Sequence, residues 1–375
     1  MDTFKVTSWN IKHADKLVTD RESDNATKKR HALARLEAIT EEIAAIDADI
    51  LFVSEGPKGE DRAQVFFDLV APGYRLITRS TDGTATARDY GIDGGTQWLW
   101  FLVRDIPDIN ATLMHNDRWY DMVERTSKGE TKGGFWDVSY PFLNKDTGIL
   151  EFGIEKRWDH YRQPQVLQVD INGAFFEIIG AHLRSKHTGA KAQGDPSDES
   201  FFNNNPELVS ELITDRVKLT TECADIRHFI DARFEEERDA AIILLGDLND
   251  GPGKERIERR FMYQDLVTAL QGDVFFARRF LNHALFDAPD DERWSANFED
   301  PLDPSRSPFI LLDHILFSQA MTRSHTGTRF AFLAKAGSGR VEHQVHHRIA
   351  SARFKYASTS DHRPISMSFA KPLVG

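Results

Sequence analysis

The sequence predicts an α/β sandwich in which sheets pack face to face and helices cover their outer sides. Short segments rich in Val, Ile, Phe and Leu are typical of strands, and they mix with helical segments without the strict alternation of a doubly wound sheet. Two of them, 165–171 and 174–181, meet at Asn172-Gly173, a pair typical of a tight hairpin. Together these observations favour stacked sheets over one parallel sheet.

The strand candidates share β-branched and aromatic residues, and several end on a polar side chain. In chain order they are 3–11, 50–54, 74–79, 97–103, 165–171, 174–181, 241–246, 309–317 and 364–369. The segment that follows the first of them, 12–28, is polar and charged and is therefore expected to be a loop.

Three helices are expected between the strands. Residues 29–48 carry apolar side chains every three or four positions, which is the helical period. A second helix is expected at about 206–234, where Pro206 suits the first turn, and a third at about 254–271.

No linker, internal repeat or low-complexity tract divides the 375 residues, of which 40% are hydrophobic. Residues with catalytic chemistry are spread from Asn10 to His362, so one domain over residues 1–375 must bring them together. Polar insertions are expected at about 105–160 and 187–205, and segments of this length usually serve function, so we expect both to border the substrate cleft. The aromatic residues of the first insertion include Trp119, Tyr120, Phe135, Trp136, Tyr140 and Trp158.

Acidic residues outnumber basic ones, 59 Asp and Glu against 47 Lys and Arg, for a formal charge of −12. Such a chain gains no general attraction to nucleic acid, because counterion release needs clustered cations. A phosphate substrate would therefore be held by a local basic patch or by a metal.

The chain begins at Met1 and runs directly into a strand-like segment, without a signal peptide, and no apolar run approaches the roughly 20 residues that span a bilayer. Cys223 is the single cysteine, so no internal disulfide is possible, which suits a reducing compartment. We expect a cytoplasmic protein that does not act at a membrane; the sequence says nothing of its oligomeric state.

Several apolar runs end on residues that bind metals or move protons. Glu55 is the strongest metal candidate, because Mg²⁺ prefers oxygen ligands and often takes only one or two carboxylates. The amide oxygen of Asn10 could bind the same metal or orient Glu55. Taken alone, each is better explained structurally, Glu55 as a solvated strand end and Asn10 as a turn residue.

Asp247 and Asn249 alternate along an extended backbone and therefore point to the same side. An acid beside an amide can orient a water and hold a phosphate oxygen. Asp313 and His362 could form a carboxylate–imidazole pair that favours imidazolium. His314 is the next residue on the strand, faces the opposite side and is expected to pack elsewhere.

His182 ends a further apolar run and is followed closely by two cations, Arg184 and Lys186, a pattern that fits a phosphate cradle. Three histidines at helical spacing, His343, His346 and His347, lack the acidic or cysteine partner of a recognised metal motif. No Walker loop, G-x-S-x-G elbow or H-E-x-x-H motif is present.

Short motifs in a fixed order carry a family resemblance. They are Trp9-Asn10, Ser54-Glu55, His182-Leu183, Gly246-Asp247-Leu248-Asn249, Leu312-Asp313-His314-Ile315 and Ser360-Asp361-His362. Taken together, they resemble the endonuclease/exonuclease/phosphatase superfamily, the deoxyribonuclease-like metal-dependent phosphoesterases, over nearly the whole chain. The form of 182–186, with Arg162 and Pro164 before it, is similar to bacterial nuclease-type members.

The resemblance implies a four-layer sandwich of two central, mostly antiparallel sheets flanked by helices, and hydrolysis of a phosphate ester with Mg²⁺ or Mn²⁺. It implies that Glu55 is the main metal ligand, supported by Asn10 and Asp361. Arg184 and Lys186 are expected to bind the substrate.

The catalytic roles implied by the resemblance fall on five residues. Asp247 would orient or deprotonate the attacking water, and Asn249 would hold a phosphate oxygen. His362, paired with Asp313, would stabilise the transition state, and His182 would contact the phosphate or assist the leaving group.

Lys12 is a departure, because some abasic-site endonucleases carry an acid at this position. The leading hypothesis is a nuclease acting on DNA or another nucleic acid. The alternatives are a phosphatase or phosphodiesterase for a small molecule or lipid headgroup and, third, a non-catalytic binding protein with the same fold.

Overall fold

A computed structural model of the chain describes residues 1–84, 97–125, 138–144, 146–155, 160–186, 191–252, 254–261, 265–322, 330–351 and 358–372. Three aromatic residues of the expected first insertion, Phe135, Trp136 and Trp158, lie outside these ranges. Within them, no helix is long and apolar enough to cross a membrane. The single-domain organisation stays a prediction.

The first large sheet has seven strands in the order β15-β17-β1-β2-β4-β3, with β16 also paired to β17. The strands are β1 (Thr3–Asn10), β2 (Ile50–Gly56), β3 (Tyr74–Ile77), β4 (Trp98–Arg104), β15 (Leu333–Ala334), β16 (Arg340–Val341) and β17 (Ile365–Ala370). Only β1 and β2 pair in parallel among these described strands.

The second large sheet has six strands in the order β11-β14-β10-β9-β8-β5. They are β5 (Ile109–Leu113), β8 (Gln165–Ile171), β9 (Ala174–His182), β10 (Ile242–Asp247), β11 (Leu281–His283) and β14 (Asp313–Ser318). Its one parallel pair in the described part is β9 with β10. Strands β8 and β9 meet at Asn172-Gly173, whose φ angles of 52° and 86° are those of a type I′ turn, so the predicted hairpin is confirmed.

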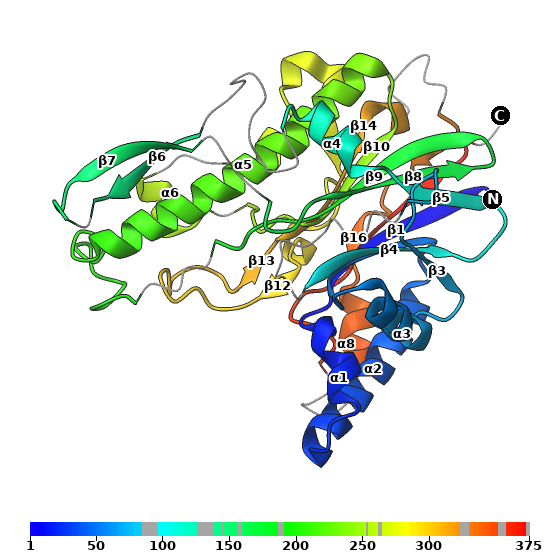
Figure 1. The fold of residues 1–375 in the computed structure, drawn as a ribbon, viewed down its shortest axis with the longest axis horizontal. Coiled ribbons are helices and arrows are strands. Elements are labelled where there is room, and N and C mark those ends of the chain that lie inside the picture. The colour runs from blue at the N-terminus through cyan, green and yellow to red at the C-terminus, as the bar shows by residue number, and fades with distance from the viewer. Residues whose placement is uncertain are drawn as a thin grey trace.

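Helices cover the outer faces of both sheets, as Figure 1 shows, with α1, α2, α3 and α8 on one side and α4 and α5 on the other. Their bounds are α1 (Ala14–Asp20), α2 (Ala26–Ile46), α3 (Glu60–Val70), α4 (Asn116–Met122), α5 (Pro206–Glu236), α6 (Arg256–Phe261), α7 (Leu266–Gln271) and α8 (His343–Ser351). Short 3₁₀ turns are η2 (Val274–Arg279), η3 (Asp290–Glu292) and η4 (Gln319–Met321). Two small hairpins join β6 (Val138–Leu143) to β7 (Leu150–Glu155) and β12 (Ala296–Asn297) to β13 (Phe309–Ile310).

Three apolar layers hold the sandwich together. Between the sheets, Phe4 of β1 stacks on Phe176 of β9 with ring centroids 4.9 Å apart. On the outer face of the first sheet, Trp9 and Trp100 pack in one cluster with apolar side chains of α1, α2 and α3. On the outer face of the second, Leu244 packs with side chains of α4, α5 and α7. The predicted four-layer sandwich with mostly antiparallel sheets is therefore confirmed.

Some predicted boundaries are wrong. Segment 12–28 is not a loop: it contains α1 and the start of α2, and α1 forms because Ala14 and Leu17 are buried against the neighbouring helices. Segment 254–271 holds two helices, α6 and α7, with 262–264 outside the described residues. The strand expected at 309–317 is broken after Ile310, because the backbone N–H of Leu312 donates to Ser295 Oγ.

The expected insertion at 105–160 also differs from its prediction. It begins with β5, which pairs with β8 at the edge of the second sheet. The first part of this segment therefore belongs to the sandwich. Short strands whose partners lie far along the chain leave only a weak local pattern, which explains the error.

Candidate active site

Strand register places the candidate residues in two rows at one end of the sandwich. In the second sheet, Asp247 at the end of β10 is opposite His182 of β9 on one side and Asp313 of β14 on the other. In the first sheet, Asn10 at the end of β1 is opposite Ser54, which precedes Glu55. Each row is fixed by backbone pairing, so it follows from the fold.

The carboxylate of Asp247 lies at the centre, where the two rows meet. Its Oδ2 accepts a hydrogen bond from Asn10 Nδ2 at 2.9 Å, which joins the first sheet to the second. The same oxygen lies 3.4 Å from His182 Nε2 and 3.9 Å from His362 Nε2. All four side chains are buried.

His362 is held from several directions. Its Nδ1 donates to Asp313 Oδ2 at 2.7 Å. Its backbone N–H donates to Ser360 Oγ, which itself donates to the carbonyl of Asn10 at 2.6 Å. Trp9 Nε1 donates to the carbonyl of His362 at 3.2 Å. The ring is thereby fixed with Nε2 facing Asp247.

Burial and charge set the protonation states of the centre. Burial disfavours the charged imidazole, but the carboxylates of Asp313 and Asp247 outweigh it and raise the pKa of His362 to about 10. Burial raises the pKa of Asp247 to about 7, against the positive charge of His362. Burial, with the charge of Arg162, lowers the pKa of His182 well below its ordinary value. At neutral pH the site therefore holds one imidazolium and one neutral imidazole.

Glu55 sits at an irregular point of β2. Its φ is 59°, in the left-handed region, and the pairing with β4 shifts register between Val53 and Gly56. This turns the carboxylate so that Oε2 accepts from the backbone N–H of His13 at 2.8 Å and from Gln97 Nε2 at 2.6 Å. A non-glycine residue in this conformation is uncommon and often marks a functional site.

Two residues of the site had no role in the sequence prediction. Gln97 bridges Glu55 to Arg162, whose terminal nitrogen donates to Gln97 Oε1 at 2.6 Å. Arg162 is partly buried, and the loss of solvent lowers its pKa; its guanidinium lies 4.7 Å from the ring centroid of Tyr161. Arg162 stands in the family-like stretch before β8, which was the available signal; no local pattern marks Gln97.

Asn249 and Asp361 lie at the rim of the centre. The backbone of Asn249 is left-handed, with φ 50°, and its N–H donates to Asp247 Oδ1 at 3.1 Å. The side-chain amide of Asn249 donates one of its protons to the carbonyl of Leu183 in a hydrogen bond. Asp361 forms an ion pair of 2.6 Å with Lys12, the position where the sequence departs from some relatives of the family.

The two cations expected to bind the substrate pair with carboxylates other than Asp247. Lys186 is buried and pairs with Asp250 and, at 2.7 Å, with Glu258. Arg184 lies 3.6 Å from Asp215. The structure does not bring either side chain to Asp247.

The remaining histidines lie apart from this centre. His314 faces away, as expected, and lies 2.7 Å from the carbonyl of Asp250 and 2.9 Å from the ring of His283. In α8, His346 pairs with Glu42 at 2.8 Å and His343 lies 2.8 Å from the carbonyl of Glu292. His343 and His346 thus have separate partners.

The donor set fits a hard divalent cation. Asn10 Oδ1 is buried without a hydrogen-bond partner among the described residues, and Glu55 Oε1 lies 3.5 Å from the amide of the same Asn10. A cation at these oxygens would also stabilise ionised Asp247. Asp247, Asp313 and His362 form the one cluster of three potential ligands in the described residues, with atoms within 4.8 Å. Protonated His362 cannot bind a metal, so we assign that cluster to hydrogen bonding instead.

No family model matches the chain, and no curated protein matches it. Among solved structures, truncated TDP2 of Caenorhabditis elegans is 14% identical with a TM-score of 0.45, covering 98% of this chain and 97% of that one. An endonuclease/exonuclease/phosphatase family protein of Bacteroides thetaiotaomicron is 14% identical at 0.46, with 99% and 98% covered. The human Nocturnin catalytic domain is 14% identical at 0.47, with 99% and 94% covered. Likenesses this distant carry no conclusion about activity, which depends on the side chains described above.

Proposed function

We propose that the protein hydrolyses phosphate esters with the help of Mg²⁺ or Mn²⁺. One observation carries the proposal: the buried carboxylate of Asp247 is surrounded by Asn10, His182 and the His362–Asp313 pair at one end of the sandwich. Burying these polar and charged side chains costs free energy and adds no apolar packing. Their presence together therefore counts against a non-catalytic binding protein.

Asp247 would position and deprotonate the attacking water. Its pKa of about 7 matches a general base that works near neutral pH. Oδ1 is oriented by the N–H of Asn249, and Oδ2 by Asn10. The second amide proton of Asn249 remains able to donate to a phosphate oxygen.

His362 would stabilise the charge that develops on phosphorus oxygens. Asp313 takes the proton on Nδ1, so Nε2–H of the imidazolium points toward the reacting group beside Asp247. A fixed donor of this kind is worth about 10²-fold in rate or more. His182, neutral and beside Asp247, would contact the phosphate or the leaving oxygen.

Glu55 and Asn10 would hold the cation, and Arg162 supplies a second positive charge near them. When bound, the cation neutralises phosphate charge and aligns the reacting groups. Gln97 keeps Glu55 in place and links it to Arg162. Asp361, expected as a third ligand, is held by Lys12 and would take part only after that ion pair opens.

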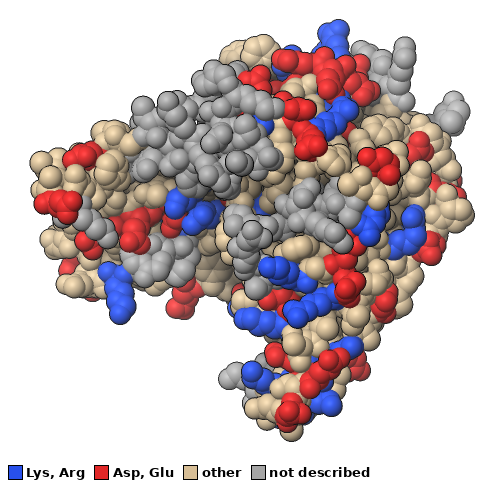
Figure 2. Space-filling view, in the orientation of Figure 1, with Lys and Arg blue, Asp and Glu red and all other residues tan. Residues whose placement is uncertain are grey.

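The substrate defines two versions of the proposal. Nuclease activity is the leading version, from the motif resemblance. A small phosphodiester is the second, and the charge distribution favours it: Lys and Arg are interspersed with Asp and Glu over the described part of the face in Figure 2. Binding a strand through counterion release needs clustered cations.

A direct test compares plasmid nicking with release of p-nitrophenol from bis(p-nitrophenyl) phosphate, each with Mg²⁺ or Mn²⁺. Activity on either substrate that is lost in Asp247→Asn and His362→Gln is expected. His347→Gln, an exposed position on α8, is the matched control and should stay active. Hydrolysis that persists in both site variants, or no hydrolysis of any phosphate ester tried, would contradict the proposal.

A further inference from the structure

A hollow of about 570 Å³ opens directly beside the proposed reaction centre, and Asn249 and Asp361 form part of its wall. Its other walls come from α5, from the loop around Phe298 and Leu302, and from the chain between β13 and β14. The volume is that of a small-molecule site, which typically measures about 300–1,000 Å³.

The floor of this hollow is apolar. Leu208 and Leu212 reach it from α5, and Ile310 and Leu312 reach it from the opposite wall. The first two belong to a small cluster with Phe202 and the other two to a separate cluster, and neither is part of the main sandwich core. The hollow therefore lies between two satellite clusters. These four side chains are only 1–8% exposed, and Phe298, also in the wall, is 47% exposed and offers a ligand the larger apolar surface.

The charged residues of the wall are mostly acidic. Glu255, Glu299, Asp300 and Asp361 line the hollow together with one cation, Lys186; Arg306 pairs with Glu255 and Asp300, and Lys12 pairs with Asp361. The ammonium of Lys186 is already paired with two further carboxylates. The described wall residues therefore offer no unpaired cation to the next phosphate of a nucleic-acid strand.

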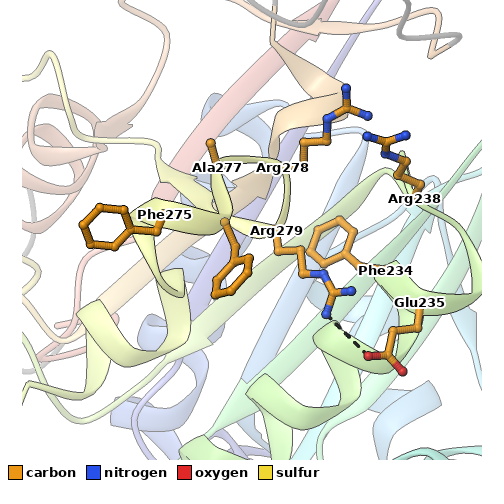
Figure 3. A pocket seen from close by; sticks show the side chains of 8 residues that line it. Phe234, Glu235, Arg238, Phe275, Ala277, Arg278 and Arg279 are labelled. Carbon is orange, nitrogen blue, oxygen red and sulfur yellow. Dashed lines mark hydrogen bonds and ion pairs between the residues drawn. The ribbon is translucent and has the colours of Figure 1, made fainter.

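A second hollow, of about 690 Å³, has no part in this site. Figure 3 shows it between Phe234 and Glu235 at the end of α5 and the η2 turn, where Arg279 pairs with Glu235. The η2 turn leads into β11, which pairs with the end of β14 farthest from Asp313. That hollow therefore opens at the opposite end of the sheet.

We infer that the hollow beside Asn249 receives an uncharged, apolar group esterified to the phosphate under attack. The inference rests on the proposed function and narrows its substrate to a small phosphodiester with an alkyl or aryl ester group. The apolar lining, the place beside Asn249 and the lack of an unpaired cation in the described wall fit such a group, whereas a polyanionic strand would need cations there.

The test uses p-nitrophenyl alkyl phosphates with methyl, butyl and hexyl groups, with Mn²⁺. Water oxygen forms a new P–O bond, the P–O bond to p-nitrophenolate breaks, the alkyl ester stays on phosphorus, and the water's proton passes to Asp247. We expect kcat/KM to rise roughly fourfold for each methylene buried, until the hollow is full. Plasmid DNA should be a poorer substrate than the hexyl ester.

Ala192→Trp tests the same hollow from the protein side. Ala192 is an exposed residue of the wall, so a Trp there fills space without entering the core. Gln193→Trp, at the next exposed position and outside the wall, is the control, and thermal unfolding checks that both variants fold. We expect Ala192→Trp to remove the gain from chain length, while Gln193→Trp keeps it.

The outcomes separate this inference from the proposed function. If Ala192→Trp lowers kcat/KM equally for all three esters, the aryl group occupies the hollow and the inference stands. If chain length and Ala192→Trp both have no effect while hydrolysis continues, or if plasmid DNA is the better substrate, the inference is overturned and the proposed function remains. If no ester and no plasmid is hydrolysed, the proposed function itself fails, and the inference with it.

Discussion

Asp313 and His362 are 49 positions apart in the chain, yet Asp313 Oδ2 and His362 Nδ1 meet at 2.7 Å in the interior. The contact joins the first residue of β14 to the turn that leads into β17, and so ties one sheet to the other. Because Asp313 is fully buried, its charge needs a partner, and protonated His362 is that partner.

Replacing Asp313 by Asn should keep the shape of this pair and remove its charge. The largest contribution that opposes burial is then lost, while that of Asp247 remains, and the pKa of His362 should fall from about 10. We expect kcat to fall by about 10²-fold or more. The alkaline limb of the pH–rate profile should move to lower pH, and NMR titration of His362 gives the same shift directly.

Asp303→Asn is the matched control for that variant, because Asp303 is a buried acid that pairs with Arg259 at 2.8 Å away from the centre. Its pH–rate profile should equal that of the wild type. An unchanged profile in Asp313→Asn would mean that His362 does not act as the imidazolium.

Gly246→Ala should destabilise the fold strongly. Gly246 has φ 141°, and a Cβ there would lie 1.8 Å from the backbone carbonyl oxygen of Ala181, in the adjacent strand. Neither backbone can move without disturbing the row of Asp247 and His182, so we expect a loss of about 3 kcal/mol or more in the free energy of unfolding.

Gly337→Ala is the control, since its φ of 67° is also positive but a Cβ would meet open space. It should lose only about 1–2 kcal/mol, the ordinary strain of a left-handed residue. Urea unfolding of both variants measures the difference. Equal losses would show that the close approach of Gly246 to Ala181 does not determine the cost of a Cβ at position 246.

Acid should destabilise the protein through buried neutral histidines. Burial, with the nearby charge of His314, lowers the pKa of His283 from 6.5 to about 3, and burial also lowers that of His314. Between these values the unfolded chain binds more protons than the folded one. The contribution is therefore fully present above about pH 6.5 and is lost as pH falls toward 3.

Urea unfolding at several pH values from 7.5 to 4 measures the net pH dependence, in which the raised pKa of Asp247 contributes with the opposite sign and is shared by wild type and variants. His283→Gln should make the decline shallower, whereas the exposed His347→Gln should leave it as in the wild type. Parallel curves for wild type and His283→Gln would argue against a neutral buried His283.

Lys186→Met should act on stability more than on substrate binding. The ammonium of Lys186 compensates two buried acids, Asp250 and Glu258. Removing it leaves Glu258 with Arg216 at 3.1 Å and Asp250 with Lys254 at 3.5 Å, so we expect a loss of about 1–3 kcal/mol, the cost of losing one charged hydrogen-bond partner. Arg184→Met, which breaks a longer and more exposed contact, should cost much less.

Unfolding measurements and Michaelis constants on the same preparations decide between the two roles of Lys186. If KM rose in Lys186→Met while stability stayed unchanged, Lys186 would bind the substrate phosphate beside His182, as the sequence predicted.

The order of strand-ending motifs predicted the sandwich and pointed to the residues that now surround Asp247. Local sequence could do this because Asn10, His182 and Asp247 each end an apolar run, and strand ends are local features. Side-chain contacts between distant segments leave no such local signal. Gln97 bridges Glu55 to Arg162 only after three distant segments have folded, and no spacing in the chain encodes that.

The errors in the predicted elements also arise because contacts with distant segments decide the structure. Helix α1 is short and gains its stability from burial of Ala14 and Leu17, so its composition alone is that of a loop. Lys186 looks like a phosphate ligand beside His182 until Asp250 and Glu258 are placed next to it.

Glu55 offers a direct test of the cation site that we propose at its carboxylate and at Asn10. Glu55→Gln keeps the size of the side chain and removes the charge. Glu60→Gln, a nearby acid on α3 that pairs with Arg79, is the matched control.

The deciding measurement is calorimetric titration of Mn²⁺ into the chelator-treated protein, with phosphodiester hydrolysis followed on the same samples. The wild type and Glu60→Gln should bind Mn²⁺ and regain activity as it is added, while Glu55→Gln should bind at least tenfold more weakly, a loss of about 1.4 kcal/mol or more. Full hydrolysis by the metal-free protein, or undiminished Mn²⁺ binding by Glu55→Gln, would contradict the account.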